Sequence, residues 1–202
     1  NKLCHGIMEE NDLYIPPGIS TMNVSENQFN QALDRIEKVY RPYVESLGGK
    51  LVVNRLWDNG TVNASAERWG NRYIINMFGG LARHPLVTTD AFLLVACHEL
   101  GHHLGGAPRN KGFFNTWASN EGQSDYFAGT KCFRKMYSDQ ENIQWAINED
   151  VHDTIADYCA RAWQDGAQQA ACMRFSKAAQ SITSMFKEIK FPNDSLDIDQ
   201  PD

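Results

Sequence analysis

The segment 97–102 (C-H-E-L-G-H) combines two imidazoles and a carboxylate at helical spacing. Positions i and i+4 of an α-helix lie one turn apart on nearly the same face, so His98 and His102 are expected to point toward a single ion. Imidazole nitrogen is a preferred ligand of zinc. Glu99 is rotated by about 100° from His98, which places its carboxylate beside the metal as a general base for a metal-activated water molecule. The spacing therefore predicts metal-assisted hydrolysis.

An H-E-x-x-H string also arises by chance, and its histidines then only decorate a helix. Here the string follows a run of apolar residues, 92–96, and is followed closely by Gly105-Gly106. This setting is typical of a helix that is buried in a core and exposes its ligands where the helix ends. The setting therefore favours a metal site over a chance match.

A third protein ligand is expected, because catalytic zinc sites commonly have three. One known pattern places a histidine six residues after His102, but Pro108 stands there. Another places an aspartate at position 133, where this chain has Phe133. Glu121 remains, 19 residues after His102 and at the start of an expected helix. We therefore predict His98, His102 and Glu121 as the ligands.

Asp125 follows Glu121 by four residues and shares its helix face. A zinc-bound imidazole usually donates its second N–H to a carboxylate, so Asp125 is expected to orient His98 or His102. The alternative is a solvated acidic helix start, since acidic residues are favoured in a first turn. The distance from the H-E-x-x-H string favours the metal site.

These motifs resemble those of a known group of enzymes. H-E-x-x-H at 98–102 followed by N-E-x-x-x-D at 120–125 resembles the gluzincins, the thermolysin-like clan of zinc peptidases. Residues 62–66 (V-N-A-S-A), a strand, a Gly-Gly turn and the zinc helix are more narrowly similar to the CAAX prenyl protease and heat-shock membrane protease family with its soluble periplasmic relatives. The resemblance covers residues 61–130. It implies a zincin-like fold, one Zn²⁺ per chain and hydrolysis of a peptide or protein substrate.

The same resemblance implies where a substrate would bind. Asn63 and Ala64 would contact its backbone. An extended peptide would add to an exposed sheet edge, for which the strand 72–78, with Ile75 and Asn76, is the leading candidate.

A donor for the tetrahedral oxyanion is also expected. His152 is the first candidate, because acidic residues at 150, 153 and 157 would hold it protonated. Tyr126, Tyr137 and Tyr158 are the alternatives. A histidine among acids also serves as a surface ion-pair partner, and His103, which points away from His98, is expected to be structural or solvent-facing.

Periodicity and breakers predict one α+β domain over residues 1–202, mainly helical with a small mixed sheet and a helix that carries H-E-x-x-H. Residues 1–24 are expected to be irregular and 191–202 to form an acidic tail. An Asn-Gly turn at 58–60 predicts a hairpin between the first two strands. The expected helices are 25–46 (disturbed at Pro42), from Thr88 or Thr89 to 105, 119–137 with a cap at Ser119, 140–164 with a break near 150, and 167–189; the expected strands are 51–57, 61–66 and 72–78.

The composition narrows the function further. A net charge of −6 and the absence of any Lys/Arg run argue against nucleic acid as a partner. The longest apolar stretch, 91–97, is too short to span a bilayer. Of the five cysteines, Cys97 is expected to be a buried free thiol, and Cys159 with Cys172 is a plausible disulfide. This cysteine content favours export, to the periplasm or the extracellular space.

Three other functions fit the same residues. A non-catalytic zinc-stabilised protein would use the site only to bind peptides and would not need Glu99. A latent enzyme would have its site blocked by the acidic tail from Asp194 to Asp202. A zinc amide hydrolase would act on a non-peptide substrate with the same ligands.

Overall fold

The structure is a computed structural model that describes residues 7–8, 11–18, 23–111 and 116–190. It is α+β, with seven α-helices and one small sheet among these residues, which confirms the predicted fold class. The chain divides after Met136 into two compact units. Each unit is described by itself, and the predicted single domain stays a prediction.

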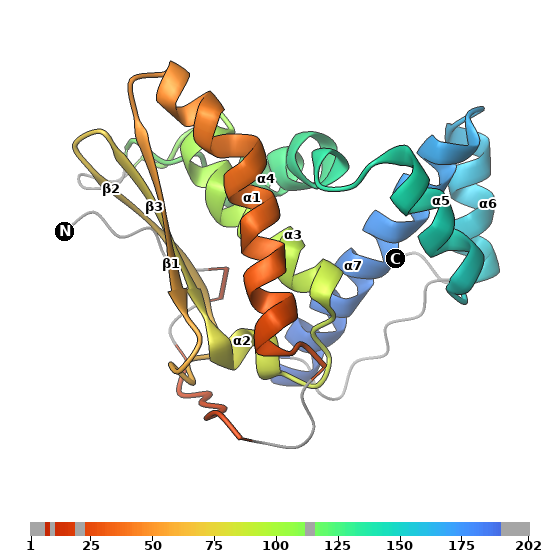
Figure 1. Ribbon diagram of the computed structural model, residues 1–202, viewed down its shortest axis with the longest axis horizontal. Helices are drawn as coiled ribbons and strands as arrows, with labels where there is room; N and C mark the ends of the chain where they lie inside the picture. The colour runs from red at the N-terminus through yellow and green to blue at the C-terminus, as the bar shows by residue number, and fades with distance from the viewer. Residues whose placement is uncertain (1–6, 9–10, 19–22, 112–115, 191–202) are drawn as a thin grey trace. The chain divides into compact units, whose positions relative to one another are not determined.

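The sheet of the first unit has the strand order β1-β3-β2 (Figure 1). β1 (Lys50–Leu56) pairs in parallel with β3 (Arg72–Phe78), and β2 (Ala64–Trp69) pairs with β3 in antiparallel fashion. The sheet is therefore mixed, as predicted. β3 lies in the centre, and β1 and β2 form the edges.

The predicted hairpin between the first two strands is wrong, because β1 and β2 are not neighbours. The hairpin joins β2 to β3 through Gly70 and Asn71 instead. At the expected turn, the Asn59 side chain accepts a hydrogen bond from Thr61 N, and Gly60 O accepts one from Ile15 N. The Asn-Gly pair thus forms a local turn that contacts the N-terminal segment.

Residues 11–15 form an extended segment that runs antiparallel to residues 60–62. Ile15 N donates to Gly60 O at 2.7 Å, and Val62 N donates to Leu13 O at 3.2 Å. The buried guanidinium of Arg83 fixes the end of this segment by donating to three backbone carbonyls. The carbonyls belong to Ile15, Trp57 and Asn59.

Two long helices pack beside the sheet (Figure 1): α1 (Glu26–Ser46) lies against β1 and α3, and α3 (Thr89–Leu104) lies against β2 and β3. α1 begins at the predicted capping box of Ser25 and Gln28 and continues past Pro42 to Ser46. α3 begins at Thr88, whose side chain accepts from Ala91 N. Most of α3 is buried, which explains its continuous apolar sequence. A short helix that the sequence did not predict, α2 (Gly79–Arg83), precedes it.

The predicted helix 119–137 is divided into three pieces. α4 (Glu121–Phe127) is followed by a π-helical turn, η1 (Ala128–Cys132), and a 3₁₀ turn, η2 (Phe133–Lys135). Its cap is Asn120, whose side chain accepts from Gln123 N, and not Ser119 as predicted. Ser119 is buried. Its carbonyl oxygen forms a hydrogen bond with His102 Nδ1, and its hydroxyl group donates one to the Gly106 carbonyl.

The second unit contains α5 (Asp139–Asn148), α6 (Asp153–Ala162) and α7 (Gly166–Lys190). The interval between α5 and α6 confirms the break predicted near residue 150. A disulfide between Cys159 and Cys172 joins α6 to α7, as the sequence suggested. The tail 191–202 lies outside the described residues. None of the helices over 7–8, 11–18, 23–111 and 116–190 combines the length and hydropathy needed to cross a membrane.

Cys97 is not the free thiol that the sequence suggested. It forms a disulfide with Cys132, which ties the buried helix α3 to η1. The sequence carried no sign of this pair, because 35 residues separate its members.

We expect the Cys97–Cys132 disulfide to contribute strongly to stability. With a separation of 35 residues, chain entropy alone predicts that Cys97→Ala/Cys132→Ala lowers the free energy of unfolding by about 4 kcal/mol. The control pair Cys159→Ala/Cys172→Ala closes a loop of 13 residues and should cost about 3 kcal/mol. Urea unfolding without reductant measures both. Titration of more than one free thiol per unreduced, denatured chain would contradict the two pairings.

Candidate metal centre

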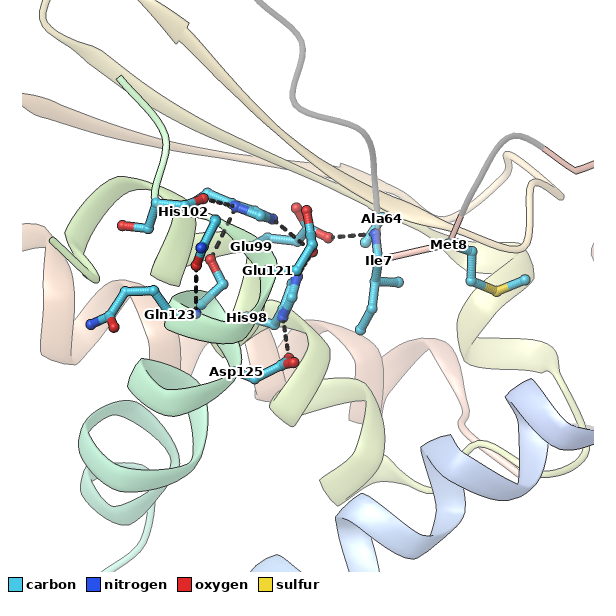
Figure 2. Close-up of polar contacts among 12 residues, drawn as sticks. Ile7, Met8, Ala64, His98, Glu99, His102, Glu121, Gln123 and Asp125 are labelled. Carbon is cyan, nitrogen blue, oxygen red and sulfur yellow. Dashed lines mark hydrogen bonds and ion pairs between the residues drawn. The ribbon is translucent and has the colours of Figure 1, made fainter. Parts of the chain in front are cut away.

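The two histidines of α3 and a glutamate of α4 meet at one point (Figure 2). His98 Nε2 lies 3.1 Å from Glu121 Oε2, and His102 Nε2 lies 3.7 Å from the same oxygen. One ligand atom from each of the three residues falls within 4.8 Å of the others. His98 and His102 are buried, whereas the Glu121 side chain is 57% exposed. The three predicted ligands therefore form a possible metal site that opens on the glutamate side.

The donor set and its spacing fit a zinc ion. Zinc binds imidazole nitrogen and carboxylate oxygen at about 2.0–2.1 Å, so two ligands of a tetrahedral ion lie about 3.3 Å apart. The two distances to Glu121 Oε2 bracket that value. Calcium and magnesium prefer sites made of oxygen alone, which disfavours them here.

The opposite ring nitrogens of the two histidines are held by hydrogen bonds. His98 Nδ1 lies 2.8 Å from Asp125 Oδ1, and His102 Nδ1 lies 2.9 Å from the Ser119 carbonyl oxygen. A carbonyl or carboxylate accepts, so each imidazole donates from Nδ1 and presents Nε2 toward Glu121. The sequence left open whether Asp125 orients His98 or His102, and in the structure it contacts His98. Ser119 was missed, because it acts through its backbone and a backbone carbonyl has no residue signature.

Charges at the site oppose one another. Burial disfavours the His98 cation, but hydrogen bonds to Asp125 and Glu121 outweigh burial and raise the pKa of His98 to about 10. Burial and the neighbouring His98 charge lower the pKa of His102. Burial alone would raise the pKa of Glu121, but its hydrogen bond to His98 lowers it. A divalent cation would replace the proton on His98 Nε2, and metal binding would therefore release a proton.

Glu99 lies beside these ligands and differs from Glu121 in its environment. Its side chain is fully buried, and burial raises its pKa to about 7, although the His98 charge opposes the rise. Oε1 accepts a hydrogen bond from the backbone N–H of Ile7 at 3.2 Å, whereas Oε2 is buried and has no hydrogen-bond partner among the residues that the structure describes. Two carboxylates whose pKa values are pushed in opposite directions suit two roles: Glu121 as a ligand and Glu99 as a base.

His103 is buried and holds α3 against the sheet. Its Nε2 donates to Ile74 O at 3.0 Å, and its Nδ1 accepts from Arg68 Nε at 3.3 Å. The ring stacks on Trp117 with centroids 4.7 Å apart. Burial, together with the Arg68 charge, lowers the pKa of His103 to about 3, so the ring is neutral. The structural role expected from the sequence therefore fits, and solvent exposure does not.

α3 and α4 approach each other closely because two glycines lack a side chain there. Gly101 lies within α3, and Gly105 is the C-cap residue of α3. A Cβ on Gly101 would lie 2.8 Å from Ser124 O and 2.9 Å from Ser124 Cα, both backbone atoms. A Cβ on Gly105 would lie 2.9 Å from Ser119 Oγ. Because Ser124 lies between Glu121 and Asp125 in the sequence, the close contact at Gly101 brings both carboxylates near the histidines.

We expect Gly101→Ala to displace α4 and weaken the site, because the new methyl group meets backbone that has no rotamer to change. Zinc affinity should fall by at least about tenfold, as for the loss of an orienting contact. Gly122→Ala is the matched control, since a Cβ there meets nothing within 4 Å and alanine favours the helix. Zinc titration against a competing chelator measures both. Equal affinities in the two variants would contradict the proposed role of the close approach.

We expect Asp125→Ala to weaken zinc binding by about 10–100-fold, because His98 loses the acceptor that orients it. Asp125→Asn should have a smaller effect, since the amide oxygen still accepts the His98 N–H. Chelator competition compares the two variants with the wild type. Wild-type affinity in Asp125→Ala would mean that this hydrogen bond does not support the ligand.

The predicted exposed edge strand is wrong. β3 lies between β1 and β2, so both of its sides are paired, and its Ile75 side chain is fully buried. Asn76 is also buried, and its amide joins the three strands by hydrogen bonds to Asn54, Ser65 and Glu67. Ile75 and Asn76 are therefore part of the sheet interior. Among the residues that the structure describes, the sheet edge next to α3 belongs to β2.

Ala64 begins that edge and lies close to Ile7 (Figure 2), and Asn63 directly precedes it. Asn63 Oδ1 accepts from Met8 N at 3.2 Å, and Asn63 Nδ2 donates to Met8 O at 3.1 Å. Ala64 N also donates to Asn63 Oδ1, at 2.9 Å. Sequence reasoning missed Ile7 and Met8, because an apolar pair in an irregular segment gives no signal of contact with a residue 92 positions away.

The proposed oxyanion donors lie in different parts of the chain. His152 is the N-cap of α6, and its Nδ1 accepts from Thr154 N at 3.3 Å. It belongs to the second unit, as do Tyr137 and Tyr158. Tyr126 belongs to α4 in the first unit and is 57% exposed. An oxyanion role for any of the four stays a prediction.

In comparisons with protein-family models, curated proteins and solved structures, nothing matches this chain.

Proposed function

We propose that the protein is a zinc-dependent peptidase that binds Zn²⁺ with His98, His102 and Glu121 and uses Glu99 as a general base. The observation that carries the proposal is the convergence of three ligand atoms beside a buried carboxylate whose pKa is raised to about 7. A general base works best when its pKa lies near the working pH. The resemblance of the same residues to the gluzincin motifs agrees with the proposal.

The roles of the residues follow from their environments. When bound, zinc would polarise the scissile carbonyl and activate water. Glu99 takes a proton from the attacking water molecule and passes it to the nitrogen of the leaving amine. His98 and His102 keep their orientation through Asp125 and Ser119, so the ligands need little rearrangement. Because Glu99 acts as a base, activity should fall when the pH drops far enough to protonate its carboxylate.

A peptide substrate is supported by the surroundings of Asn63. This side chain contacts both the N–H and the C=O of a single residue, Met8. An N–H and a C=O on either side of one Cα atom occur in every residue of a peptide except proline, whereas a simple amide lacks this arrangement. The amide of Asn63 therefore favours a peptide over the non-peptide substrate of an amide hydrolase.

A non-catalytic zinc-stabilised peptide-binding protein is the alternative function. It would share the ligands and Asn63 but would gain nothing from Glu99. A fully buried carboxylate is costly unless it is paired, and one oxygen of Glu99 has no hydrogen-bond partner among the described residues. Retention of such a group favours the catalytic function. The tail of the proposed latent enzyme lies outside the described residues.

We also infer export to the periplasm or the extracellular space. The structure pairs four of the five cysteines in two disulfides. Such bonds persist in oxidising compartments and are rare in the cytosol.

We expect Glu99→Gln and Glu121→Ala to fail in different ways. Glu99→Gln should keep about one zinc per chain and lose about 10²–10⁴-fold in peptide hydrolysis, because only the base is removed. Glu121→Ala should lose most of its zinc, because a ligand is removed. Elemental analysis after dialysis and cleavage of a peptide library measure the two properties.

Glu45→Gln is the matched control, since Glu45 is an exposed residue of α1 and should change neither property. A wild-type rate in Glu99→Gln would refute the mechanism. Full zinc content in Glu121→Ala would refute the third ligand.

A further inference from the structure

The chain places its own backbone at the site. Ile7 N–H donates to Glu99 Oε1 (Figure 2). The backbone of Met8 forms two hydrogen bonds with the Asn63 side chain. Only main-chain groups of Ile7 and Met8 take part in these bonds. Every peptide offers the same groups, so the backbone of a substrate could form the same hydrogen bonds.

We propose that the protein is its own first substrate and cleaves the peptide bond between Gly6 and Ile7. The inference rests on the proposed function, in which Glu99 passes a proton to the nitrogen of the leaving amine. The backbone nitrogen within hydrogen-bonding distance of Glu99 is that of Ile7, at 3.2 Å. The peptide bond that contains this nitrogen joins Ile7 to Gly6. Ile7 and Met8 are therefore the first two residues of the leaving chain.

The contacts of Met8 fix this register. Asn63 holds Met8 by its N–H and its C=O, one residue beyond the leaving nitrogen. The Met8 residue is only 2% exposed, so its side chain is also enclosed. A shift of the segment by one residue would break both hydrogen bonds with Asn63 and move the Met8 side chain out of its enclosure. The enclosed Met8 side chain thus opposes cleavage at neighbouring bonds.

The rest of the N-terminal segment keeps Ile7 near Glu99. Residues 11–15 pair with residues 60–62, and Arg83 holds the Ile15 carbonyl. Because the segment is tethered on its C-terminal side, the bond is presented within the same molecule, and the effective concentration is high. Cleavage is therefore expected to be intramolecular, with a rate that does not depend on protein concentration.

The reaction is a hydrolysis and consumes one water molecule. The C–N bond between the Gly6 carbonyl carbon and the Ile7 nitrogen breaks, and the water oxygen bonds to that carbon. One proton of the water passes through Glu99 to the Ile7 nitrogen. The products are a fragment that ends in a Gly6 carboxylate and a chain that begins with the amine of Ile7. No oxidant or other co-reactant is needed.

The test compares the amino terminus of the wild type with that of Glu99→Gln. Each protein is purified in chelator, supplied with zinc, and followed by intact mass and N-terminal sequencing at two protein concentrations. We expect a new terminus at Ile7 in the wild type, at the same rate at both concentrations. Glu99→Gln, which keeps its ligands, should retain Gly6 throughout. An external peptide is assayed in parallel.

Met8→Pro tests the register, because proline lacks the N–H that Asn63 accepts. Loss of that hydrogen bond should slow self-cleavage roughly tenfold. Met8→Leu is the matched control, since it keeps the N–H and an apolar side chain of similar volume, and it should cleave at nearly the wild-type rate. Equal rates in the two variants would refute the role of this hydrogen bond in setting the register.

The outcomes separate the inference from the function on which it rests. An active enzyme that cleaves the external peptide but keeps Gly6 attached would overturn the inference and leave the peptidase intact; the segment would then be an uncleaved inhibitor. Cleavage in Glu99→Gln, or at another bond, would also overturn it. A zinc-loaded wild type that cleaves neither its own segment nor the external peptide would overturn both.

Discussion

The close approach of α3 and α4 is the constraint on which the candidate metal centre depends. The two helices meet where Gly101 leaves room for the backbone of Ser124, which a single methyl group would meet at 2.8 Å. This contact brings Glu121 to the two imidazoles and Asp125 to the far side of His98. The disulfide between Cys97 and Cys132 joins the same helix to η1, directly after α4. Packing, rather than any one polar bond, therefore assembles the ligands.

Differences in burial give Glu99 and Glu121 different chemical properties. His98 and His102 are withdrawn from water, and each is held by an acceptor at Nδ1. Glu99 is enclosed and has its pKa raised, while Glu121 faces the histidines and has its pKa lowered. The same chemical group thus suits a base in one place and a ligand in the other, because the balance between desolvation and neighbouring charge differs.

The N-terminal segment connects the sheet to the site. It pairs with the residues that lead into β2, and its Ile7 and Met8 backbone lies where β2 begins. Since β3 is enclosed between two strands, β2 is the strand beside α3 with one side that no other described strand pairs. The arrangement explains how one stretch of irregular chain contacts both Asn63 and Glu99.

The sequence by itself determined the features that depend on neighbours along the chain. The i, i+4 pair on α3, the capping box at Ser25 and the break near residue 150 follow from helix geometry and from hydrogen bonds within a few residues. The sequence also indicated Glu121, because its distance from His102 left few other ligands. Tertiary structure alone decided the strand order, the Cys97–Cys132 pair and the contact of Ile7 with Glu99. These features join residues far apart in the chain. They depend on which surfaces of the helices and strands pack together, and no local sequence pattern encodes that choice.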